Sequence, residues 1–153
     1  MSTGIVLIAA LAVIAGVFVD WLLRGQAFTP PSTGVYVALF TAAPTDAGGG
    51  TEVAGNGYAR VSVANSLAAW AGTQAAASTT ASSGTNGTTS NNATISFPTP
   101  TPAGWGTVVA FGVFDAATLG NLLFYAPLTV SKTINAGDAV TFAAGALSLQ
   151  IDN

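Results

Sequence analysis

The chain has 153 residues and a net charge of −3; hydrophobic residues make up 50% of it and charged residues only 6%, against roughly 25% charged residues in an ordinary globular protein. With three basic residues and neither histidine nor cysteine, the chain lacks what nucleic-acid binding, zinc sites, disulfides, thiol catalysis and Ser-His-Asp triads require. We therefore expect a protein that is not an enzyme, has no metal or cofactor, and hides part of its weakly charged surface in an assembly.

The first predicted element is an apolar helix from Gly4 to Leu23, interrupted only by Asp20. A helix of about 20 residues is about 30 Å long, which is the thickness of a bilayer core. Since the helix is apolar nearly all round, protein or lipid has to cover it. At its end we expect an ion pair between Asp20 and Arg24, four residues apart, and a stop at Gly25.

One face of this helix carries large apolar side chains that are alternately four and three residues apart. This spacing is typical of helices that associate with one another. It favours an oligomerisation helix over a membrane span, because no basic residue precedes the apolar run and Asp20 would lie close to the membrane boundary. A membrane span stays open as the alternative. The predicted oligomer interface consists of Leu7, Leu11, Ile14, Phe18 and Trp21.

Beyond Pro30 and Pro31 the pattern changes to short β-rich runs separated by turn residues. The change marks a boundary between an apolar helix in residues 1–26 and a β-domain in residues 27–153. No second helical pattern follows, so the predicted fold is mainly β, an antiparallel β-sandwich with one N-terminal apolar α-helix. Strands are predicted at 35–41, 58–63, 94–97, 107–114, 122–128, 139–142 and 146–151.

Two further expectations concern packing within the β-domain. Residues 71–93 contain mostly Ala, Ser, Thr, Gly and Asn, so this low-complexity stretch is predicted to be a surface loop, or else an arm that becomes ordered on a neighbouring subunit. Phe111 and Val113 are two residues apart on one predicted strand and therefore share a face. Together with Phe142 they are predicted to lie in the sandwich core.

The carboxylates of the β-domain are candidates for a metal or catalytic site, but they are predicted to have structural roles in turns. Asp46 and Glu52 flank three glycines, but a calcium loop needs several closely spaced oxygen ligands, so a turn in which the aspartate caps its own backbone is favoured. Asp115 and Asp138 lie in turns between strands, where they are expected to accept backbone N–H bonds. The sequence therefore assigns no catalytic, cofactor-binding or metal-binding residue.

Several blocks of the sequence carry a family resemblance. They include LLRG at 22–25, AFTP at 27–30, VYVALFTAAPTDAGGGTEV at 35–53, GYAR at 57–60, FGVFDAAT at 111–118, GNLL at 120–123, KTINAGD at 132–138 and FAAGAL at 142–147. In these blocks, and in their order from about residue 20 to residue 152, the chain resembles a family of small tailed-bacteriophage virion proteins. Members of that family are labelled tail fibre, virion-associated or capsid decoration proteins.

The resemblance implies a structural protein of the virion. The favoured role is a capsid decoration or cement protein that stabilises the head from its surface. Its expected partners are further copies of the chain, as a trimer, and the major capsid protein, with no nucleic acid. The alternatives are a tail or tail-fibre module, a receptor- or carbohydrate-binding module, and a membrane-anchored virion protein.

Overall fold

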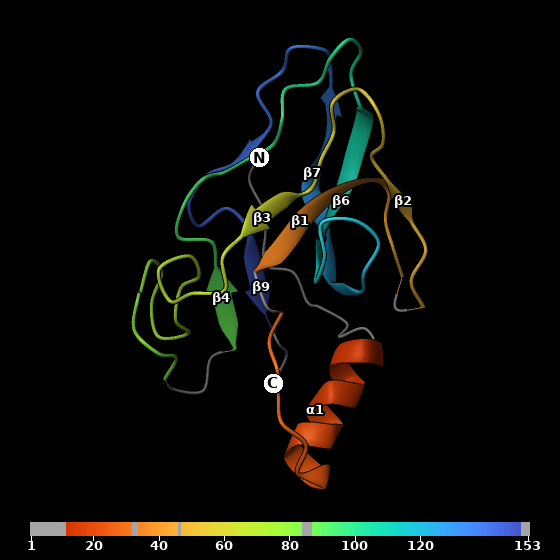
Figure 1. Cartoon of the computed structure of the whole chain (residues 1–153). Coiled ribbons are helices and arrows are strands. Elements are labelled where there is room, and N and C mark those ends of the chain that lie inside the picture. Colours follow the sequence, from red (N-terminus) through yellow and green to blue (C-terminus); the bar gives the residue numbers. More distant parts are fainter. Residues whose placement is uncertain (1–11, 32–33, 46, 84–86, 151–153) are drawn as a thin grey trace.

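A computed structural model describes residues 12–31, 34–45, 47–83 and 87–150 of the chain. Within these ranges one helix, α1 (Ala12–Arg24), lies at one end of a β-rich body (Figure 1). The predicted fold class, mainly β and antiparallel with one helix near the N-terminus, is confirmed. The strands are β1 (Val35–Ala42), β2 (Thr51–Glu52), β3 (Val61–Val63), β4 (Thr88–Ser90), β5 (Ile95–Ser96), β6 (Gly106–Phe114), β7 (Leu122–Ile134), β8 (Thr141–Phe142) and β9 (Ser148–Gln150).

The largest sheet is built around β6, which pairs with β1 on one side and with β7 on the other. The strand order is β2-β1-β6-β7, and all pairs are antiparallel. β1 is longer than either of its outer neighbours, so β3 pairs with its first half and β2 with its second half. The long apolar run at the centre of the sequence is therefore the central strand of the sheet.

Two small ladders, β4–β9 and β5–β8, complete the β-body. Side chains from these ladders pack against one face of the large sheet in a single apolar core, which is the layered arrangement of a sandwich. The predicted core residues Phe111, Val113 and Phe142 are all fully buried there, and the rings of Phe111 and Phe142 meet edge to face at 5.8 Å. That prediction is confirmed.

The opposite face of the large sheet carries a second, smaller cluster, made by Ala38, Phe40, Ala110 and Phe114. β6 is therefore buried on both faces, as a central strand should be. Gly112 is needed between these side chains, because a Cβ there would lie 2.7 Å from Leu122 and 2.8 Å from the ring of Phe40. The absence of a side chain here leaves room on this face for Phe40 of β1 and Leu122 of β7, on the two neighbouring strands.

Four strands differ most from the predicted ones. β3 begins at Val61 rather than at residue 58, since the Tyr58 amide donates to the Gly55 carbonyl in a turn. β7 runs on to Ile134, and the short strand β2 was not predicted. β4 lies inside the stretch 71–93, where Thr88 pairs with Gln150 of β9. These strands are held by backbone ladders, which alternation of side chains does not report.

Asn91, near the end of this stretch, is a buried polar residue whose side-chain groups all have partners. Its side-chain amide donates to the carbonyls of Ala93 and Ala143 at 2.7 and 2.8 Å, and its Oδ1 accepts from the Leu147 amide at 2.9 Å. A buried amide that makes all these bonds adds stability, whereas an unpaired one would remove it.

The division of the chain into a helix and a separate β-domain stays a prediction.

The end of α1 follows the expected pattern. Arg24 pairs with Asp20 at 2.6 Å, Gly25 has a φ of +67°, and the Gln26 amide donates to the Asp20 carbonyl at 3.1 Å. The predicted residues 4–11 of the helix lie outside the described residues. In the part of the chain that is described, no helix has the length and apolarity needed to span a membrane.

Candidate interaction surface

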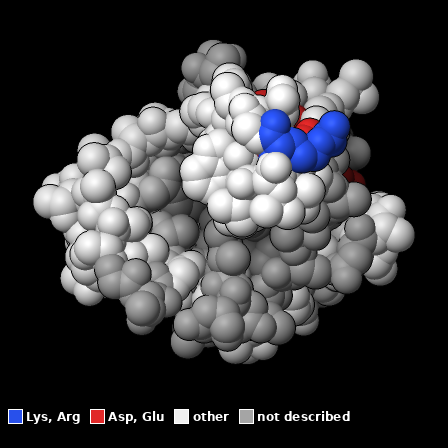
Figure 2. Space-filling model, turned by 90° about the horizontal axis from the view of Figure 1, so that it is seen from below, with Lys and Arg blue, Asp and Glu red and all other residues white. Residues whose placement is uncertain are grey.

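The helical end of the molecule exposes a run of large apolar side chains. We call it the apolar helix surface. In Figure 2 the face seen from this end is almost free of charge apart from one small group of basic and acidic atoms. Apolar side chains scattered singly are normal on a protein, but a contiguous group of them marks an interaction site. The apolar helix surface consists of Val17, Phe18, Val19, Trp21, Leu22, Leu23 and Phe28.

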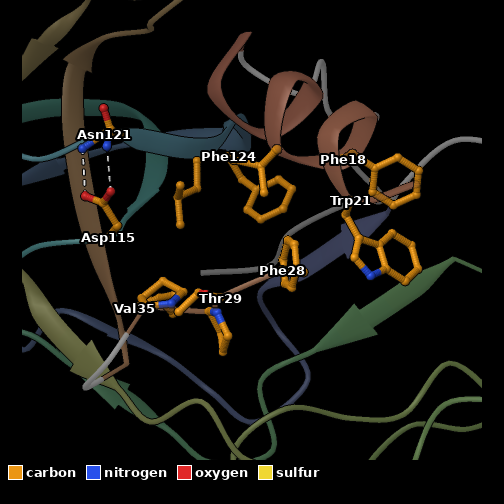
Figure 3. A pocket seen from close by; sticks show the side chains of 12 residues that line it. Phe18, Trp21, Phe28, Thr29, Val35, Asp115, Asn121 and Phe124 are labelled. Atoms are coloured by element: carbon orange, nitrogen blue, oxygen red, sulfur yellow. Dashed lines mark hydrogen bonds between the residues drawn. The ribbon is translucent and has the colours of Figure 1, made fainter. Parts of the chain in front are cut away.

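A groove of about 760 Å³ lies between α1, the segment that follows it, and the start of β7. We call it the aromatic groove, because Phe18 and Trp21 come from α1, Phe28 from the connecting segment, and Phe124 from β7 (Figure 3). The rings of Phe18 and Trp21 contact each other at 5.7 Å. The rest of the lining is Val17, Thr29, Pro30, Pro31, Val35, Asp115, Asn121 and Leu123.

The polar groups at one end of the aromatic groove already hydrogen-bond to each other. Asn121 donates to Asp115 twice, through its backbone amide to Oδ1 and through its side-chain amide to Oδ2, both at 2.7 Å (Figure 3). This confirms the prediction that Asp115 accepts a backbone N–H bond in its turn. Since each carboxylate oxygen already accepts a bond from Asn121 and most of the lining is apolar, the groove is suited to an apolar occupant.

The turn between β6 and β7 is held from the side by Arg60. Its Nη1 donates to the carbonyls of Ala116 and Leu119, at 2.8 Å each, and its guanidinium lies 3.4 Å from the centre of the Phe114 ring. Nε and Nη2 of Arg60 bind the two carboxylate oxygens of Glu52 at 2.8 and 2.7 Å. A two-point pair of this kind fixes the guanidinium plane and thereby the turn.

Tyr58 joins the same network. Its hydroxyl donates to Glu52 Oε1 at 3.0 Å and accepts from the Leu39 amide at 2.9 Å. Burial raises the pKa of the Tyr58 hydroxyl far above its usual range, and the nearby Glu52 carboxylate adds to the rise. Glu52 therefore ties β1, β2 and the β6–β7 turn together. Asp46, which was predicted to cap its own backbone in a turn, lies outside the described residues.

The family described as Podophage GP4 fiber I protein gp80 matches residues 10–150, which is nearly the whole chain. The chain belongs to this family. The resemblance to tailed-phage virion proteins is thereby confirmed, and the protein is a structural protein of a phage virion. No match was found among curated proteins.

The predicted oligomer interface is described in part. Phe18 and Trp21 are both about half exposed and form one wall of the aromatic groove. Leu7 and Leu11, and the side chain of Ile14, lie outside the described residues. The use of this face of the helix in an oligomer stays a prediction.

Other predicted site residues have the structural roles expected of them. Asp138 accepts from the Asn135 amide at 2.8 Å, as a turn aspartate should. The described ranges contain no cluster of acidic residues that could hold a metal ion. Sequence reasoning missed Phe28 and Phe124 as groove residues. Phe28 carried a signal, a large aromatic residue between the helix and two prolines, whereas Phe124 read only as one more strand residue.

Proposed function

We propose that the chain is a non-enzymatic structural subunit of a phage fibre, and that copies of it assemble through the apolar helix surface. The observation that carries this proposal is the exposure of Trp21, Leu22, Leu23 and their neighbours. Burying one such side chain completely contributes about 1.5–3 kcal/mol. The seven side chains of this surface are 38–75% exposed, so leaving them in water forgoes about 5–10 kcal/mol, which is comparable to the stability of a whole domain. A partner that covers this surface recovers that free energy.

The chain's own helix is the partner that the sequence supports best. The spacing of Leu7, Leu11, Ile14, Phe18 and Trp21 suits a helix bundle formed by several copies, with a trimer as the expected state. The net charge of −3 is small, so copies repel one another weakly. The engaged carboxylates, Glu52, Asp115 and Asp138, support a role without catalysis.

Placement in a fibre is supported by the family to which the chain belongs, because its description names a fibre protein. The sequence favoured a decoration protein on the head, bound to the major capsid protein. The apolar helix surface would serve that role equally well, because it requires a protein neighbour without specifying which one. Imaging of the particle separates the two proposals: a fibre subunit is present in few copies at the tail, and a decoration protein in many copies over the head.

Assembly itself is tested by sedimentation velocity on the purified full chain. Trp21→Glu, on the predicted interface, should convert the oligomer into a monomer while the β-rich circular dichroism spectrum is unchanged. Val130→Glu is the matched control, since Val130 is 72% exposed but lies outside the apolar helix surface. An oligomer that survives Trp21→Glu, together with wild-type protein that floats with lipid vesicles, would show that the helix is a membrane anchor.

A further inference from the structure

The helix α1 carries two separate apolar faces. Phe18 and Trp21 form one wall of the aromatic groove. Val19, Leu22 and Leu23 are 48%, 60% and 75% exposed and do not line that groove. Since Leu22 and Leu23 follow Val19 by three and four residues, the three side chains form one stripe on the helix. We call this stripe the helix ridge.

The helix ridge cannot fill the groove of its own chain, because ridge and groove wall belong to the same helix. One helical turn takes 3.6 residues, so Leu23, five residues after Phe18, lies about 140° from it around the helix axis. The helix therefore turns the Phe18 face towards the groove and the Leu23 face away from it. A groove that receives the ridge has to come from another molecule.

The aromatic groove has the size and chemistry of a site for several aliphatic side chains. Its volume of about 760 Å³ lies in the range of about 300–1,000 Å³ that is typical of pockets for whole drug-sized molecules, so a single side chain would leave most of it empty. Aromatic rings from α1, the connecting segment and β7 line it (Figure 3). The charged group at its end, Asp115, is bonded to Asn121. An uncharged helix face with several large side chains fits such a groove.

We propose that the helix ridge of one copy packs into the aromatic groove of the next copy, head to tail around the trimer. This contact rests on the proposed self-assembly and assigns the two faces that meet in it. In a ring of identical subunits joined head to tail, each copy touches its two neighbours through two different surfaces. Phe18 and Trp21, on the predicted oligomer interface, then contact the ridge of one neighbour, while Leu22 and Leu23 contact the groove of the other.

A second copy is favoured as the partner because it leaves no apolar face uncovered. A different protein or a lipid that filled the groove would leave the ridge in water, whereas a ring of identical chains covers every ridge with a groove. Charge is also compatible. Asp20 and Arg24, which lie beside the ridge on the helix, pair with each other at 2.6 Å. The contact therefore brings no unpaired charge against an apolar surface.

The test uses the fact that a head-to-tail contact joins two different surfaces of the full chain. Leu22→Glu disables the ridge and keeps the groove, and Phe28→Glu disables the groove and keeps the ridge. Both side chains are more than half exposed, so the β-rich circular dichroism spectrum should be unchanged. Each variant alone should sediment as a monomer, because every contact would then bury an unpaired carboxylate. Val130→Glu is the matched control and should remain a trimer.

An equimolar mixture of the two variants should form dimers. The intact groove of the Leu22→Glu chain can accept the intact ridge of the Phe28→Glu chain, and the remaining ridge and groove of that pair are both disabled. At equal total concentration, sedimentation velocity should show about tenfold more dimer in the mixture than in either variant alone, which corresponds to a tenfold difference in association constant or more.

Two results would overturn the head-to-tail contact while leaving the proposed function intact, provided that the wild-type chain is an oligomer. One is a mixture that is as monomeric as its two components, which is expected if the copies meet through the same face on each side. The other is a trimer that survives Leu22→Glu or Phe28→Glu. A wild-type chain that sediments as a monomer would overturn both the contact and the proposed function.

Discussion

The β-body and the helical end of this protein both carry large apolar side chains but differ in what covers them. Phe111 and Phe142 are fully buried by strands of the same chain, whereas Leu22 and Leu23 of α1 are 60% and 75% exposed. In the body even polar groups such as Asn91 have partners within the chain. We therefore expect the body to fold by itself and the helical end to require another molecule.

This comparison predicts two kinds of variant: body variants should change the free energy of unfolding, and helical-end variants should change association. The largest effect is expected for Phe111→Ala, which removes a fully buried ring and leaves a cavity, lowering the free energy of unfolding by about 3–5 kcal/mol. Urea denaturation measures it, with Val130→Ala as a surface control expected to stay within about 0.5 kcal/mol of wild type. A loss below about 1 kcal/mol would show that Phe111 is not in the core.

Asn91→Ala should come next, with a loss of about 3 kcal/mol, because it leaves two carbonyls and one amide without their partner in the interior. The neighbouring residue offers a matched control. Asn92 makes only two long side-chain bonds, at 3.3 and 3.4 Å, and its Oδ1 has no partner among the described residues. Asn92→Ala should lower the free energy of unfolding by about 1 kcal/mol. Equal losses in the two variants would contradict the structural role given to Asn91.

Arg60→Met keeps much of the apolar stem of the side chain and removes its charge and donors. We expect a loss of about 2 kcal/mol, typical of bonds to charged groups that are partly buried. A double-mutant cycle with Glu52→Gln measures the coupling of the pair. Additive losses would mean that the two residues act independently and that the turn is held by Asp115 alone.

The pH dependence of stability tests the Tyr58 network. Since burial raises the pKa of Tyr58 in the folded state, the folded protein keeps its phenolic proton at pH values where the unfolded chain, with a pKa of about 10, has lost it. Stability should therefore be constant below about pH 10 and fall above it, by at most about 1.4 kcal/mol per pH unit for this one proton. Denaturation of wild type and Tyr58→Phe at pH 8 to 11 checks this, and parallel curves for the two proteins would assign the fall to other groups.

The smallest effect on folding should come from removing the helical end altogether. A chain that begins at Ala27 should keep the β-rich circular dichroism spectrum and unfold within about 1 kcal/mol of the full chain when both are monomeric, because α1 buries little surface against the body. The same chain should not form oligomers through the predicted helix interface. An unfolded product would show that the helix belongs to the core, and the distinction between the two regions would be wrong.

The sequence by itself determined the features that local signals encode. Alternation and turn residues predicted β1, β6 and most of β7; the spacing of Asp20 and Arg24 with Gly25 predicted the end of α1; and Asp115 was recognised as a turn residue. The order of short sequence blocks also predicted the phage virion family. Each of the structural signals lies within a few residues of the feature it describes, so periodicity and residue type were sufficient.

Only the tertiary structure decided the rest. Three contacts join residues far apart in the chain. Arg60 bonds to Glu52 and to the carbonyls of Ala116 and Leu119. Asn91 bonds to the Ala143 carbonyl and the Leu147 amide, and Phe28 and Phe124 line one groove. A stretch of polar residues can have the same local sequence in a solvated loop as in a buried network. Whether they are buried depends on which distant backbone groups the fold brings to them, and no local pattern records that.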